Sequence, residues 1–117
     1  MSSSPSLRFD DFANPPSRNR PAPFWAINDV ITPEETARQM SDLIDKGFHG
    51  GFFHSRSGLA TEYLGKEWFD SIRAALDVAE KEDGYFWLYD EDGFPSGNCG
   101  GAVTEANEDY AAANLVP

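Results

Sequence analysis

Polar and charged side chains gather at four places in the sequence, and three of these places follow short apolar runs. The four groups are Asn28 with Asp29, His54 with Arg56, the run from Tyr89 to Asp92, and the run from Ser96 to Asn98. An imidazole, a guanidinium and carboxylates beside Trp and Tyr rings suit a polyhydroxylated ligand, because sugars offer hydroxyls to charged partners and apolar faces to aromatic rings. We therefore expect a sugar-binding site if the fold brings these groups together.

Three apolar runs are the elements that would position these groups. They cover residues 23–27, 50–54 and 85–89, and they alternate with two amphipathic segments. This alternation predicts an α/β fold in the order β-α-β-α-β, with a parallel sheet and right-handed crossovers. The third run is continuously apolar, so it is predicted to be buried on both faces. Parallel strands would bring their carboxyl ends, and the polar groups that follow, to one edge of the sheet.

Both amphipathic segments carry helix-boundary signals. Thr32 is an N-cap, Pro33 suits the first helical position and Glu35 completes a capping box. The first helix is predicted to end at Lys46-Gly47; the second covers residues 66–82 and is stopped by Gly84. Apolar spacing predicts their buried stripes, which are Ala37, Met40, Leu43 and Ile44 in the first helix and Trp68, Ile72, Ala75, Leu76 and Ala79 in the second.

The segments outside these elements are predicted to be less regular. Residues 1–22 are rich in Ser and Pro, which disfavours helix and strand, so they are interpreted as an extended leader. The polar stretch from Ser55 to Gly65 is predicted to be a long loop. Residues 107–116 are predicted to start a further helix, with Asn107 as its cap and Tyr110 on its inner side.

The composition excludes several kinds of partner. Nine Lys and Arg against twenty Asp and Glu give a net charge of −11, which argues against binding to nucleic acid or to an anionic membrane surface. No apolar run approaches the roughly 18 residues of a membrane-spanning helix, and the first twenty residues contain no apolar stretch of a signal peptide. A cytoplasmic location is the default expectation. The single cysteine, Cys99, cannot form a disulfide within the chain.

Neither a metal nor another cofactor is expected. Counting from Asp90 as the first position of a calcium loop, the sixth residue is Pro95 and the twelfth is Gly101, where the loop requires glycine and glutamate.

Two site residues have alternative interpretations. His54 could be a hydrogen-bonded histidine at a strand end, and Arg56 could form an ion pair with an acid such as Asp29 or Asp90. A small hydrolase that pairs His54 with Asp90 is a weaker alternative, because no nucleophile stands beside a glycine-rich elbow.

Five motifs in order resemble the opening of bacterial glycoside hydrolase-like proteins that are labelled α-L-rhamnosidase-like (glycoside hydrolase family 106 and its relatives). The motifs are Arg-Pro-Ala-Pro-Phe-Trp at 20–25, Thr-Pro-Glu-Glu at 32–35, Gly-Gly-Phe-Phe-His-Ser-Arg-Ser-Gly-Leu at 50–59, Tyr-Leu-Gly-Lys-Glu-Trp-Phe at 63–69 and Trp-Leu-Tyr-Asp-Glu-Asp-Gly-Phe-Pro-Ser-Gly at 87–97. The resemblance runs from about Phe9 to the end of the chain. It is more specific for the superfamily than for the sugar.

The resemblance implies that residues 23–117 form the first three βα units of a TIM (β/α)8 barrel. It implies hydrolysis of O-glycosidic bonds, with rhamnosides as candidate substrates and the remaining barrel segments as partners. It also implies that the catalytic acid and base lie beyond residue 117, so that this chain alone would be inactive. The residues implied to line the glycan pocket are Asn28, His54, Arg56, Tyr89, Asp90 and Asp92.

A small stand-alone α/β binding module without catalytic activity is the competing interpretation. It predicts that the isolated chain unfolds cooperatively as a monodisperse species. The barrel interpretation predicts exposed apolar surface at the first and third strands when these residues are considered alone.

Overall fold

A parallel three-stranded sheet is the frame of the structure. The computed structural model describes residues 8–94 and 99–113. Its strands β1 (Phe24–Asp29), β2 (Gly50–Leu59) and β3 (Tyr85–Asp92) lie in the order β1-β2-β3, and both neighbouring pairs are parallel. Helix α2 (Pro33–Asp45) connects β1 to β2, and helix α3 (Lys66–Lys81) connects β2 to β3. The predicted α/β fold and parallel sheet are therefore confirmed.

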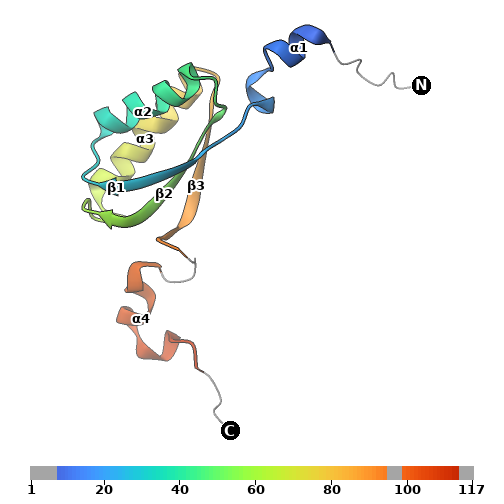
Figure 1. Ribbon diagram of the computed structural model, residues 1–117. Coiled ribbons are helices and arrows are strands. Elements are labelled where there is room, and N and C mark those ends of the chain that lie inside the picture. The colour runs from blue at the N-terminus through green and yellow to red at the C-terminus, as the bar shows by residue number, and fades with distance from the viewer. Residues whose placement is uncertain (1–7, 95–98, 114–117) are drawn as a thin grey trace.

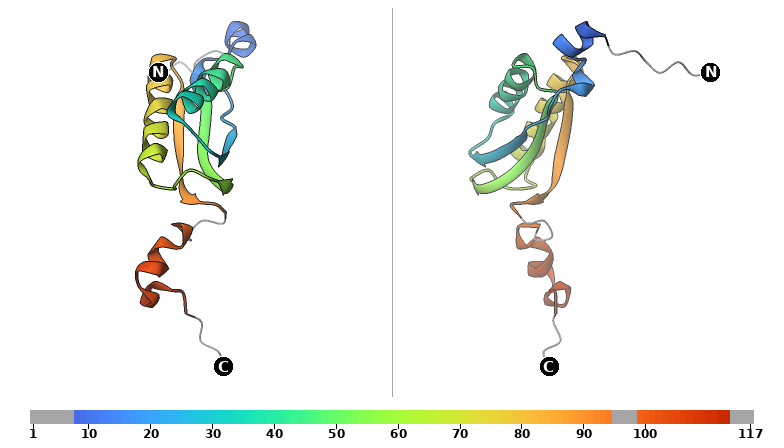
Figure 2. Two further views of the ribbon diagram at one scale, coloured as in Figure 1. Left: turned by 90° about the vertical axis from the view of Figure 1, so that its left-hand side faces the viewer. Right: turned by 45° about the vertical axis from the view of Figure 1, so that its right-hand side comes forward.

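Both connecting helices lie on the same side of the sheet and pack against each other (Figures 1 and 2). Side chains alternate along each strand, so Trp25 and Phe53 point toward the helices while Phe52 and Trp87 occupy the opposite face. Within the described residues, no helix covers that opposite face. The structure is thus two layers, with one face of the sheet open.

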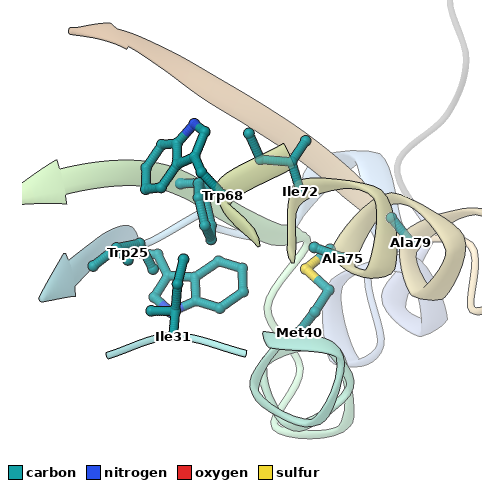
Figure 3. Packing of buried hydrophobic residues seen from close by; sticks show 9 residues of the cluster. Trp25, Ile31, Met40, Trp68, Ile72, Ala75 and Ala79 are labelled. Atoms are coloured by element: carbon teal, nitrogen blue, oxygen red, sulfur yellow. The ribbon is translucent and has the colours of Figure 1, made fainter. Parts of the chain in front are cut away.

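The hydrophobic core fills the space between the sheet and the two helices (Figure 3). Its buried members are Trp25, Ile27, Ile31, Met40, Phe53, Trp68, Ile72, Ala75 and Ala79. The one polar atom of Trp25 is satisfied, because its Nε1 donates a hydrogen bond to Gln39 Oε1 at 2.8 Å. Gly51 allows the helix layer to approach closely, since a Cβ there would lie 3.1 Å from Leu43 Cδ1.

The boundaries of α2 follow the predicted signals. Thr32 Oγ1 accepts a hydrogen bond from Glu35 N at 3.2 Å, which confirms the N-cap. The Glu35 carboxylate does not close the box but accepts from Arg38 and Gln39, and these bonds lower the pKa of Glu35 to about 2. At the other end Gly47 has φ +89°, the left-handed conformation that terminates a helix.

Three predicted details of the core elements are wrong. Strand β2 continues to Leu59, so the first part of the expected loop from Ser55 to Gly65 is strand. On α3, Leu76 is 46% exposed, whereas Ser71 is buried. Strand β3 is not buried on both faces, because Tyr85 and Leu88 are exposed and no described helix covers the open face of the sheet.

Short helices extend from both ends of the two-layer body. The predicted leader contains α1 (Phe9–Ala13) and the 3₁₀ helix η1 (Ser17–Asn19), so it is not wholly extended. Beyond β3 lie η2 (Cys99–Gly101), α4 (Ala102–Ala106) and η3 (Glu108–Tyr110) (Figure 1). These extensions give a radius of gyration of 18.9 Å, against about 13 Å for a compact domain of this length.

The predicted helix at 107–116 is wrong over its described part. Asn107 does act as a cap, since its Oδ1 accepts from Asp109 N at 3.0 Å, but the turn that follows is the short η3. Tyr110 is 64% exposed rather than facing inward. Residues 114–116 lie outside the described residues. None of the described helices combines the length and the apolar character that crossing a membrane requires.

The end of α3 generates a stability prediction. The residue with left-handed backbone at this end is Asp83, with φ +55°, and not Gly84. Gly84 is required for a different reason, since a Cβ at this position would lie 2.5 Å from Ile44 Cδ1. We predict that Asp83→Gly raises the free energy of unfolding by about 1 kcal/mol, because it removes positive-φ strain and an acid at a helix carboxyl end. The matched change Gly47→Ala is expected to lower it by about 1 kcal/mol. Urea denaturation of the full-length protein measures both, and a loss of stability in Asp83→Gly would contradict the assignment.

Candidate functional site

A pocket of about 530 Å³ lies at the carboxyl ends of β2 and β3. One wall is formed by residues 56–63, which comprise the end of β2 and the start of its connection to α3. The other wall is formed by residues 92–94, where β3 ends. Its position is the one predicted for a binding site of a parallel sheet, outside the carboxyl ends of the strands.

Both strand ladders change register next to this pocket. Phe53 pairs with Leu88 but Ser55 pairs with Asp92, so two steps along β2 correspond to four along β3. A similar shift separates Ile27 from Asp29 in the pairing of β1 with β2. Irregularities of this kind bend strands and redirect side chains, and they are common beside functional sites.

The connections after β1 and β2 are fastened to each other behind the pocket. The buried Thr61 hydroxyl accepts a hydrogen bond from Ile31 N at 2.9 Å, and Ala60 N donates to Asp29 O at 2.9 Å. Asp29 has φ +63°, and its own Oδ1 accepts from Val30 N at 2.8 Å. These bonds hold the pocket wall that contains residues 56–63 to the sheet.

Arg56 contributes a positively charged side chain to the pocket lining. It is exposed, and among the described residues it forms neither an ion pair nor a hydrogen bond. The predicted alternative, an ion pair with Asp29 or Asp90, is therefore not observed. The carboxylates of Glu62 and Asp92 belong to the same lining, so the guanidinium and the acids face one cavity. A guanidinium has five N–H donors, and none of those of Arg56 is bonded within residues 8–94 and 99–113.

Tyr63 supplies a neutral phenol to the same lining. Burial raises the pKa of the Tyr63 hydroxyl, and the nearby carboxylates of Glu91 and Asp92 raise it further, so it stays protonated and able to donate. Its ring packs edge-on against Trp68, with ring centroids 5.2 Å apart. The pocket thus combines a cation, carboxylates and an aromatic hydroxyl.

His54 lies behind the pocket rather than in its lining. It is fully buried; its ring lies 4.5 Å from the ring of Phe24 and 4.0 Å from that of Tyr89, measured between centroids. Its Nε2 is 2.9 Å from Gly93 O, while Nδ1 has no partner among the described residues. Neither nitrogen is bonded to Asp90, so the weaker interpretation of a His54–Asp90 hydrolase gains no support. The alternative of a hydrogen-bonded histidine at a strand end describes His54 better.

The six predicted pocket residues therefore divide into three groups. Arg56 and Asp92 line the pocket, and His54 and Tyr89 lie on the open sheet face behind it. Asn28 and Asp90 are exposed near the strand ends but do not line the pocket. The predicted group from Ser96 to Asn98 lies outside the described residues.

Sequence reasoning missed part of the lining. Thr61, Glu62 and Tyr63 were predicted to belong to a featureless loop, although Tyr63 opens one of the five motifs. Ser55 was missed because the second strand was expected to end at His54, whereas β2 continues to Leu59. Its buried hydroxyl donates a hydrogen bond to Asp92 Oδ1. The sequence has no apolar alternation beyond His54 that could have found Ser55, because Ser55, Arg56 and Ser57 are all polar.

Within the acidic run at the end of β3, Glu91 holds the backbone. Glu91 is 4% exposed, and its Oε1 accepts hydrogen bonds from the backbone N–H groups of Asp92 and Cys99.

Across residues 8–94 and 99–113, no three side chains of His, Cys, Asp or Glu are grouped so that they could hold a metal ion.

Comparisons with protein-family models, with curated proteins and with solved structures yield no significant match. The relationship to glycoside hydrolases therefore stays a prediction that depends on the sequence motifs.

The contrast between His54 and Arg56 generates a prediction about stability. We expect His54→Ala to lower the free energy of unfolding by about 2–4 kcal/mol, because a fully buried ring between Phe24 and Tyr89 leaves a cavity when it is removed. Arg56→Ala should change it by less than about 0.5 kcal/mol, since this side chain is exposed and unpaired. Chemical denaturation of the full-length protein measures both. Equal effects would show that the burial of His54 is not as described.

Proposed function

We propose that this chain is the amino-terminal part of a carbohydrate-active glycoside hydrolase. In this role it forms the first three βα units of a TIM barrel and contributes sugar-binding residues, while the catalytic carboxyl pair lies on later strands beyond residue 117. The observation that carries the proposal is the pocket at the strand carboxyl ends, where Arg56, Tyr63 and Asp92 face one cavity. TIM-barrel enzymes place their sites at this end of the strands.

The exposed face of the sheet supports a barrel. The strands are adjacent in sequence order and both helices cover one side, as in a barrel wall. The opposite face is rich in aromatic rings, of which Phe24 is 53% and Tyr85 45% exposed. In a barrel this face is the interior, where layers of side chains from the other strands bury it. The barrel interpretation expects this apolar exposure at β1 and β3.

The chemistry of the lining favours a sugar as the ligand. Arg56 and the neutral Tyr63 hydroxyl donate hydrogen bonds, and the Asp92 carboxylate accepts them, which matches hydroxyl groups that do both. The rings of Tyr63 and Phe94 can pack against apolar faces of a pyranose. Rhamnosides are the candidate substrates that the motifs suggest.

The carboxylates at the end of β3 are better suited to binding than to cleavage. A glycosidase needs two carboxyl groups, about 5–5.5 Å apart for retention or roughly 6.5–9.5 Å apart for inversion. Asp92 accepts a hydrogen bond from Ser55, and Glu91 is buried against two backbone N–H groups. Groups engaged in this way support the placement of the acid and base on other strands.

A stand-alone binding module is the second candidate, and the closed core between sheet and helices favours it. The two candidates differ in the behaviour of residues 1–117 when they are produced alone. A cooperative thermal transition of a monodisperse species is expected of a module. Aggregation or gradual melting is expected of a barrel fragment, because its open apolar face would be unprotected.

The sugar-binding role of Arg56 can be tested with a charge-matched control. In the full-length protein we predict that Arg56→Ala weakens binding of methyl α-L-rhamnopyranoside at least about tenfold, since hydrogen bonds from a charged donor are lost. Arg73→Ala removes the same charge from the exposed face of α3 and should leave the affinity unchanged. Isothermal titration calorimetry measures both variants.

Two results would contradict the proposal. One is the absence of binding to any of a panel of methyl glycosides, and the other is an equal effect of Arg56→Ala and Arg73→Ala. Hydrolysis of 4-nitrophenyl glycosides by the full-length protein, but not by residues 1–117, would support the placement of the catalytic pair.

A further inference from the structure

Two neighbouring residues of β2 hold the turn that follows β3. The Ser55 hydroxyl donates to Asp92 Oδ1, and Ser55 O accepts from Gly93 N at 3.1 Å. His54 Nε2 lies 2.9 Å from Gly93 O. The backbone of Gly93 is thus bonded through both its N–H and its C=O, and the adjacent carboxylate is bonded as well. Both Asp92 and Gly93 belong to the pocket lining.

The change of register explains why side chains are needed at this point. The regular pairing of β2 with β3 is interrupted between Phe53 and Ser55, where β3 has two additional residues. An interruption of this kind leaves residues unpaired and disrupts the ladder locally, so the turn that follows has fewer backbone bonds to hold it. The side chains of His54 and Ser55 supply two of the three bonds that connect this turn to β2.

The partner of His54 determines which ring nitrogen donates. A carbonyl oxygen only accepts, so Nε2 carries the proton that is directed at Gly93 O, and Nδ1 is the second ring nitrogen. That Nδ1 is buried and has no partner among the described residues, which is unfavourable for a polar atom. The contacts with Phe24 and Tyr89 keep the ring in this orientation nonetheless. The bond to Gly93 is therefore the one hydrogen bond that the described residues offer the His54 side chain.

We propose that Ser55 and His54 are positioning residues for the pocket, and that they act on the ligand through Asp92 and Gly93. Ser55 engages Oδ1 of the carboxylate, which orients the remaining lone pairs of Asp92 for a hydroxyl of a polyhydroxylated ligand. His54 fixes the carbonyl of Gly93 and so the path of the chain along the pocket wall. The ligand part of this inference rests on the proposed sugar-binding function, whereas the fastening of the turn does not.

Hydrogen exchange tests the fastening without any ligand. In the full-length protein, Ser55→Ala should increase deuterium uptake in the peptide that contains Gly93, measured by mass spectrometry. Ser71→Ala is the matched control, because Ser71 is equally buried on α3 but its hydroxyl has no partner among the described residues. Unchanged exchange in Ser55→Ala would overturn the fastening of the turn, whatever the ligand is.

Calorimetry with methyl α-L-rhamnopyranoside tests the effect on the ligand. Ser55→Ala should weaken binding roughly tenfold, and Ser55→Thr, which keeps the hydroxyl, should restore most of the affinity. In an Asp92→Ala background, Ser55→Ala should cause no further loss if it acts through Asp92. His54→Gln keeps a side-chain N–H for Gly93 and should bind more tightly than His54→Leu.

The outcomes separate this inference from the proposed function. If the wild type binds the glycoside and Ser55→Ala binds it with the same affinity, the positioning role is overturned while the sugar-binding proposal stands. Failure of the wild type to bind any methyl glycoside, together with increased exchange in Ser55→Ala, would overturn the sugar-binding proposal and the ligand part of the inference. The fastening of the turn would then stand alone.

Discussion

The parallel pairing of three strands is the constraint on which the rest of the structure depends. Because β1, β2 and β3 run in the same direction, their carboxyl ends meet at one edge of the sheet. Segments that are far apart in the sequence, residues 56–63 and 92–94, thereby become two walls of one pocket. Had the strands been antiparallel, these segments would lie at opposite edges.

The amino-terminal and carboxyl-terminal halves of the strands differ in their pairing and in what they support. Toward the amino ends the ladders are in register, and Trp25 and Phe53 pack against the helices with rings 5.2 Å apart. Toward the carboxyl ends both pairs lose register. There the Ser55 hydroxyl donates a hydrogen bond to Asp92, and the Thr61 hydroxyl accepts one from Ile31 N in the connection after β1. The same irregularity that weakens backbone pairing turns side chains toward the pocket. A rigid core therefore supports a site that is built from bends and loops.

Local signals in the sequence predicted the fold better than the site. The alternation of apolar runs with capped amphipathic helices was sufficient for a parallel α/β sheet, and Thr32 and Gly47 marked the ends of α2 as expected. The length of β2 was underestimated because Ser55, Arg56 and Ser57 are polar, although their polarity reflects the end of the sheet rather than the end of the strand.

Side-chain burial at the site depends on long-range packing that sequence spacing does not contain. His54 is a polar residue at a strand end, and this pattern predicts an accessible ligand group. It is instead covered by Phe24 from β1 and Tyr89 from β3, so its burial depends on the pairing of three strands. Leu76 shows the converse, since its spacing fits the apolar stripe of α3 but no described element covers it. The exposure of the aromatic side chains on the open sheet face likewise depends on which elements pack against that face, and the sequence spacing does not show this.

The register between β2 and β3 in a crystal structure of the full-length protein tests the central claim most directly. The account predicts that Gly93 N donates to Ser55 O and that the Ser55 hydroxyl donates to the Asp92 carboxylate. An uninterrupted ladder would continue the pairing of Phe53 with Leu88 and place Glu91 N on Ser55 O instead. That result would remove Asp92 and Gly93 from the pocket wall, and the proposed site with them.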